Sequence, residues 1–202
     1  MHSRQRVRAL YSLKAVGHTQ AIFGGNMPQE NEALDTARLF IDRINSGIGR
    51  AVAWAAVALV GVQFTAVVLR YVFGIGWIWV EESIVYLHAS VFMAGAAYTL
   101  LQDGHVRVDI FYRDADAMSC ARVDLFGTIF FLWPVSALIL IKGWPYVAAS
   151  WAIFEGSPET SGIPAVFILK SLILVFAATI MLQGASMAAS AALVLRRADT
   201  TR

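Results

Sequence analysis

The sequence predicts an all-α integral membrane protein with four transmembrane helices and an amphipathic N-terminal interfacial helix. Of the 202 residues, 58% are hydrophobic and only 15% are charged, which is more apolar surface than one soluble core of this size could bury. The apolar residues also come in blocks as long as the roughly 20 residues of helix that cross a bilayer. A helix bundle in water would show amphipathic stripes instead of such blocks.

Residues 1–33 form a basic N-terminal extension. Four basic side chains lie in its first half, namely Arg4, Arg6, Arg8 and Lys14. The extension has neither an apolar core of signal-peptide length nor a small-residue cleavage pattern, so we do not expect a cleaved secretion signal. We expect it to be disordered or to be a mis-assigned start, with translation beginning at Met27.

The segment that follows has the pattern of an amphipathic helix. Its apolar residues recur at spacings of three and four, at Leu34, Ala37, Ile41, Ile44 and Ile48. The opposite face carries polar residues, at Asp35, Arg38, Asp42 and Asn45. This pattern predicts an interfacial helix that lies on the membrane. Such a helix is either an ordinary lead-in to the first span or a dedicated partner-binding element.

Four apolar segments predict membrane spans over about residues 48–69, 80–101, 125–151 and 165–195. Together with the lead-in they define a membrane domain over residues 34–198, and a short tail of residues 199–202 follows it. The segment from Gln102 to Asp124 is too charged to lie in hydrocarbon, so we expect a loop or a surface helix there. Pro134 is expected to kink the third span.

The distribution of Lys and Arg predicts the orientation of the spans. Seven of these residues precede the apolar core of the first span, and three follow the last span. Since positively charged residues are enriched on the cytoplasmic side of membrane proteins, we expect both termini in the cytoplasm. The first and third loops then face the opposite side.

Two acidic residues, Glu81 and Glu82, open the second span. The positive end of the helix dipole stabilises carboxylates there by about 0.3 to 1 kcal/mol. Adjacent residues of a helix point about 100° apart. One carboxylate can therefore face water while the other turns toward a partner.

Two further residues inside the spans are candidates for packing or interface contacts. Gly95 lies among small residues of the second span, which let another helix approach closely. Lys170 lies about two turns inside the fourth span, and its long stem lets the ammonium group reach the membrane interface.

The segment from Gly104 to Asp109 alternates polar and apolar residues directly after the second span. His105, Arg107 and Asp109 have side chains suited to acid–base catalysis, but a single run on one loop does not make an active site. We interpret the segment as an architectural lock, in which Gly104 permits a sharp exit and Arg107 pairs with a carboxylate or with helix carbonyls. The alternative is a solvated turn whose charges bind one another or lipid headgroups.

The sequence offers no catalytic or metal-binding motif. Its single cysteine, Cys120, forms no internal disulfide and belongs to no cluster with metal-ligand spacing. A b-type haem held between two helices would need two intramembrane histidines, and His88 is the only one inside a predicted span. No nucleophile motif or HExxH-type site occurs either. We therefore expect no enzyme activity, no cofactor and no nucleic-acid partner.

Four short motifs follow one another between residues 70 and 109. They are Arg70-Tyr71-Val72-Phe73, Trp79-Val80-Glu81-Glu82, Phe92-Met93-Ala94-Gly95-Ala96-Ala97-Tyr98 and Gly104-His105-Val106-Arg107-Val108-Asp109. In this order they resemble the DctQ-type small permease family of tripartite ATP-independent periplasmic (TRAP) transporters. The resemblance covers Leu39 to Leu195.

The resemblance implies a division of labour in a bacterial inner membrane. A periplasmic binding protein captures an organic acid or related small solute, a large membrane subunit carries the substrate and sodium sites, and the lipid-embedded small subunit supports it. The alternative is a membrane anchor subunit of a redox enzyme complex, against which the missing second histidine argues. In such a system the residues that select the substrate would lie on the other two proteins.

Overall fold

A computed structural model of the chain describes residues 29–102, 104–105 and 115–200. All regular structure in this part of the chain is helical, which confirms the predicted all-α class. The elements are α3 (Gln29–Phe73), α4 (Ile78–Leu101), α5 (Ala117–Gly127), a π-helical turn η2 (Thr128–Leu132), α6 (Trp133–Ala152) and α7 (Val166–Thr200). Among the described residues, four helical stretches are long and apolar enough to cross a membrane: α3, α4, α5 through α6, and α7.

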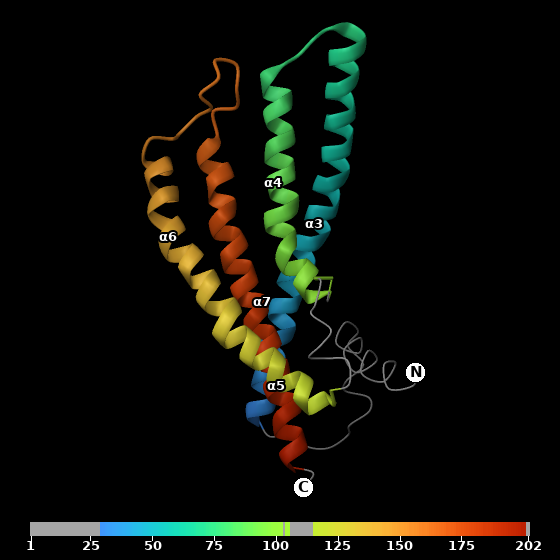
Figure 1. The fold of residues 1–202 in the computed structure, drawn as a ribbon, viewed down its shortest axis with the longest axis vertical. Coiled ribbons are helices and arrows are strands. Elements are labelled where there is room, and N and C mark those ends of the chain that lie inside the picture. The colour runs from blue at the N-terminus through green and yellow to red at the C-terminus, as the bar shows by residue number, and fades with distance from the viewer. Residues whose placement is uncertain (1–28, 103, 106–114, 201–202) are drawn as a thin grey trace.

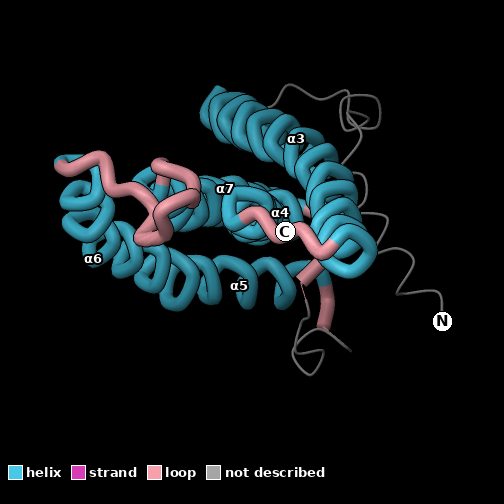
Figure 2. Tube along the Cα trace, turned by 90° about the horizontal axis from the view of Figure 1, so that it is seen from above, coloured by secondary structure: helices cyan, strands magenta, loops and turns pink. Residues whose placement is uncertain are grey.

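The helices form a bundle that is held together around α4 and α7. α4 packs against both α3 and α7, and α6 packs against α7. Seen from above, α3 and α6 lie on opposite sides of the bundle, with α4 and α7 between them (Figure 2). The α3–α4 and α6–α7 loops lie at one end of the molecule, and the start of α3 and the end of α7 lie at the other (Figure 1).

The amphipathic segment is not a separate helix. α3 is a single α-helix of 45 residues, so this segment continues directly into the first span. Its polar side also faces inward: Asn45 is only 1% exposed, whereas Phe40 on the apolar side is 65% exposed. The polar side chains of this lead-in pack against α7, and apolar ones such as Phe40 and Ile44 are exposed.

The third span starts at α5, earlier than the expected residue 125. Asp116 caps this helix by accepting a hydrogen bond from the Ser119 backbone N–H at 3.2 Å. A hydrogen bond from the Ser119 side chain, together with the one from its backbone N–H, lowers the pKa of the Asp116 carboxyl below its usual value. The π-helical turn η2 lies directly before the Trp133-Pro134 pair. Because proline lacks an N–H and its ring clashes with the carbonyl four residues earlier, a π-turn at this place accommodates Pro134 inside the helix.

Gly74 ends the first helix, with φ of +67° in the left-handed region that glycine adopts without strain. The chain then turns so that the backbone N–H of Ile75 donates to the Leu69 carbonyl at 3.0 Å. This tight turn makes α3 and α4 antiparallel neighbours.

Glycines set the distance between α3 and α4. A Cβ atom at Gly49 would lie 2.3 Å from ring carbons of Tyr98, and one at Gly95 would lie 3.2 Å from Val52 Cγ1. Each helix therefore offers one glycine to a larger side chain of the other. This close approach is the role that small residues play between transmembrane helices.

We expect Gly49→Ala to destabilise the fold by about 1 to 3 kcal/mol, because the new methyl group overlaps the Tyr98 ring. The matched control is Gly47→Ala in the same helix, where no atom lies within 4 Å of the new methyl group. That variant should be neutral or up to about 1 kcal/mol more stable, since alanine is the better helix former. Unfolding of both variants in detergent measures the difference, and equal stabilities would contradict the packing described here.

Candidate functional site

Polar side chains gather at the two ends of the bundle. The first group, which we name the loop-end cluster, comprises Arg70, Glu81, Glu82, Glu155, Ser157 and Lys170. The second group, which we name the polar layer, comprises Asp35, Arg38, Asp42 and Asn45 of α3 with Gln183, Ser186 and Ser190 of α7. Each group joins helices that are far apart in the sequence.

Glu82 holds the loop between α6 and α7. Its carboxylate accepts a hydrogen bond from the Ser157 hydroxyl and another, 2.5 Å long, from the Ile163 backbone N–H. Gly162 passes close to the same carboxylate, since a Cβ there would lie 2.6 Å from Glu82 Oε1. The first turn of α4 is thereby fastened to the loop that precedes α7.

Glu81 points elsewhere and pairs with Arg70 at the end of α3. The Arg70 Nη2 to Glu81 Oε1 distance is 2.5 Å, and both side chains are about half exposed. Exposed ion pairs of this kind contribute about 0.2 to 1 kcal/mol. The two adjacent glutamates thus have different partners: that of Glu81 lies across the hairpin turn, and those of Glu82 lie on the loop between α6 and α7.

Lys170, near the start of α7, forms the third contact of the loop-end cluster. Its ammonium lies 2.5 Å from Glu155 Oε2 and 4.3 Å from the centre of the Tyr146 ring. The hydrogen bond from Lys170 holds the pKa of the Glu155 carboxyl below its usual value. The charge of Lys170 is thus paired with the loop at the same end of the bundle.

Replacing the two adjacent glutamates should have unequal effects. We expect Glu82→Ala to destabilise the chain by about 1.5 to 3 kcal/mol, since it removes two hydrogen bonds to a charged group. It should also expose the loop of residues 153–165 to proteolysis. Glu81→Ala is the matched control, and it should cost at most about 1 kcal/mol. Limited proteolysis with unfolding in detergent tests this, and the assignment fails if the two variants behave alike.

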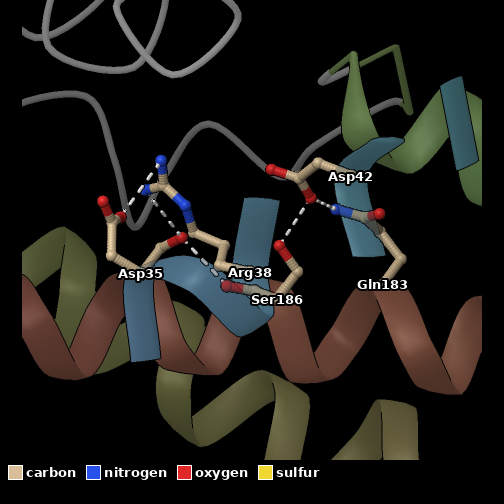
Figure 3. A network of polar contacts seen from close by, with 6 residues as sticks. Asp35, Arg38, Asp42, Gln183 and Ser186 are labelled. Atoms are coloured by element: carbon tan, nitrogen blue, oxygen red, sulfur yellow. Dashed lines mark hydrogen bonds and ion pairs between the residues drawn. The ribbon is translucent and has the colours of Figure 1, made fainter. Parts of the chain in front are cut away.

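The polar layer is a directed chain of hydrogen bonds between α3 and α7 (Figure 3). Asn45 Nδ2 donates to Gln183 Oε1 at 2.6 Å, and Gln183 Nε2 donates to Asp42 Oδ1 at 3.3 Å. The same carboxylate oxygen accepts from the Ser186 hydroxyl at 2.6 Å. Because Asp42 only accepts when ionised, the orientations of both amide groups are fixed by this order.

Arg38 extends the polar layer with longer contacts. Its guanidinium lies 3.5 Å from Ser190 Oγ and 3.5 Å from Asp35 Oδ1, and its side chain is only 11% exposed. Its Nε and the Oδ1 atom of Asn45 are buried without a hydrogen-bond partner among the described residues. The layer therefore has its short bonds at Asp42 and Asn45 and its looser contacts at Arg38.

We expect Gln183→Leu to destabilise the bundle by about 1 to 3 kcal/mol, because the buried Asn45 amide loses its acceptor. In the double variant Asn45→Leu/Gln183→Leu no amide is left unpaired, so its loss should be smaller than the sum of the two single losses. Thr65→Val is the control, since that hydroxyl bonds only to the Gly61 carbonyl of its own helix. Additive losses in detergent unfolding would show that the two amides do not act as a pair.

The remaining predicted positions lie at the end of α4. The Gly104 backbone N–H donates to the Thr99 carbonyl at 2.8 Å, and a Cβ at Gly104 would lie 3.0 Å from Thr99 Cγ2. His105 follows and is exposed. Arg107 and Asp109 lie outside the described residues, so the interpretation of this segment as an architectural lock stays a prediction.

Sequence reasoning did not find the polar layer as a site. Asp42 and Asn45 are visible in the sequence as members of a polar helix face, and Gln183 is visible as a lone amide in the fourth span. Nothing in the spacing of the residues indicates that these side chains meet. An amide that interrupts an apolar span is the signal that could have suggested such a pairing.

The described residues contain no group of three or more His, Cys, Asp and Glu side chains that could hold a metal ion.

A family model described as tripartite ATP-independent periplasmic transporters, DctQ component, matches residues 39–194. The chain belongs to this family. No curated protein and no solved structure matches it.

DctQ membership accords with the architecture. The chain is a small subunit of a TRAP transporter and a multi-pass membrane protein, and its family comprises transporter components, not enzymes. The matched region contains the whole loop-end cluster and the Asp42–Asn45–Gln183 part of the polar layer. Asp35 and Arg38 precede it.

Proposed function

We propose that this chain supports the large permease subunit of a TRAP transporter during ion-gradient-driven uptake. The transported solute is an organic acid or a related small molecule, delivered by a periplasmic binding protein. The observation that carries this proposal is the DctQ family match over residues 39–194. In this division of labour the small subunit stays fixed while the large subunit binds and moves the solute.

The use of polar side chains within the bundle supports a scaffolding role. Asn45 donates a hydrogen bond to Gln183, and Gln183 donates one to Asp42, so these polar groups bond within the chain itself. A self-sufficient secondary transporter is expected to place polar groups and broken helices around a midplane site. Here α3, α4 and α7 run as continuous helices through the regions that could cross the membrane.

The orientation we propose puts both termini in the cytoplasm of the inner membrane. The seven basic residues before the apolar core of the first span and the three after the last span support it. The loop-end cluster would then face the periplasm, where its paired charges would stiffen the surface that a binding protein approaches. A reporter active only in the cytoplasm, fused after Arg202, tests this orientation.

Reconstitution separates support from transport. Liposomes that contain only this chain should show no solute uptake, because the large subunit carries the transport sites in this proposal. Liposomes with both membrane subunits, a sodium gradient and the loaded binding protein should show uptake. Liposomes with the large subunit alone are the control, and they should retain less activity than the complex. Sodium-dependent uptake by this chain alone would refute the proposal.

A further inference from the structure

Two polar side chains near the middle of the membrane region are left exposed by the fold. Gln63 lies in α3 and His88 lies in α4, and both side chains are exposed. Neither makes a hydrogen bond or ion pair to any other described residue, and the centre of the His88 ring lies 4.6 Å from that of the Phe92 ring. They differ in this from the polar layer, whose amides and carboxylate bond to one another.

Both residues lie at a similar depth. α4 spans Ile78 to Leu101, so His88 is about 15 Å from its start at 1.5 Å per residue, near the middle of a hydrocarbon core of about 30 Å. The Gly49–Tyr98 and Val52–Gly95 contacts fix the antiparallel register of the two helices. In that register Gln63 and His88 lie within about one helical turn of each other in depth.

The exposed side of α4 around His88 is a narrow stripe. Val85 and Phe92, one turn to either side, are 54% and 67% exposed. Gly95 and Ala97 of the same helix are buried in the bundle. The stripe therefore lies on the outer surface of the chain, where lipid or another membrane protein can contact it.

Lipid cannot satisfy these two side chains. Acyl chains offer no hydrogen-bond donor or acceptor, and a polar group left unpaired in an apolar medium is costly. Neither an imidazole nor an amide on a short stem can reach the interface from the middle of the bilayer, as lysine does. The hydroxyl groups of Thr65 and Ser90, at comparable depth, avoid this cost by bonding to carbonyls of their own helices.

We propose that Gln63 and the α4 stripe of Val85, His88 and Phe92 form the surface on which transmembrane helices of the large permease subunit dock. Polar groups of that subunit complete the hydrogen bonds of Gln63 and His88 inside the membrane. The inference rests on the proposed function, because the large subunit is the membrane-embedded partner that it supplies. Val85 and Phe92 provide the apolar contact around the polar pair.

The test measures how much large subunit co-purifies with the tagged chain from membranes that contain both. We expect the double variant Gln63→Leu/His88→Leu to retain about tenfold less large subunit than the unmodified chain, through the loss of two interhelical hydrogen bonds. His88→Gln keeps a donor and an acceptor and should retain most of it. Phe64→Leu, next to Gln63 and 69% exposed, is the control and should leave the yield unchanged.

A lipid-facing surface gives the opposite result. Leucine would then remove an unfavourable polar group, so the double variant would be at least as abundant in the membrane and would retain the large subunit in full. That outcome would overturn the inference while leaving the proposed function intact. If the unmodified chain retains no large subunit at all, the proposed function fails together with the inference.

A photoreactive phenylalanine analogue at Phe92 identifies the occupant. We expect a cross-linked product with the mass of this chain plus the large subunit, and its yield should fall in the double variant. A product of two copies of this chain, or adducts with lipid alone, would overturn the assignment. Detergent unfolding of each variant establishes that the bundle itself is intact.

Discussion

A bilayer offers no hydrogen-bond partner to the groups inside it, and this constraint accounts for the polar contacts within the spans. Backbone groups are satisfied within helices, and hydroxyls such as those of Thr65, Ser90 and Thr179 donate to carbonyls one turn back in their own helices. Asn45 and Gln183 pair across the α3–α7 contact at the end of the bundle opposite the α3–α4 loop. The polar side of the start of α3 faces inward because the hydrogen-bond partners of Asp42 and Asn45 lie on α7.

The two polar groups divide the work of holding the bundle. The loop-end cluster ties α4 to the loop between α6 and α7 through Glu82 and joins that loop to α7 through the Glu155–Lys170 pair. The polar layer ties α3 to α7 at the other end. α7 takes part in both. Between the two ends the helices are held by close packing, with Gly49, Gly95 and Gly184 each receiving a larger side chain of a neighbouring helix. α7 is thereby fixed at both ends and closely packed between them.

The sequence was enough to predict the all-α class, the four spans and the family, because blocks of apolar residues and a set of ordered motifs are properties of the chain itself. The second span is the closest match, expected over 80–101 and found at Ile78–Leu101. The packing of the start of α3 could not be predicted, because a helical periodicity shows that one side is polar but not what that side faces. Likewise, the different directions of Glu81 and Glu82 follow from helix geometry, whereas their partners Arg70, Ser157 and Ile163 depend on how two loops come together. Contacts of that kind are long-range, and no local pattern encodes them.

The region that matches the DctQ family model, residues 39–194, contains only part of the polar layer. Asp42, Asn45 and Gln183 lie inside residues 39–194 and make the short bonds, while Asp35 and Arg38 lie before it and make contacts of 3.5 Å. The short bonds determine how α3 and α7 are placed along each other, because moving one helix by a turn would strand an amide and a carboxylate in the bundle. The longer Arg38 contacts extend the polar layer toward the start of α3, but they do not determine how α3 and α7 are placed along each other. Gln63 and His88 contrast with this arrangement: their helices are already positioned by other contacts, and both side chains remain exposed.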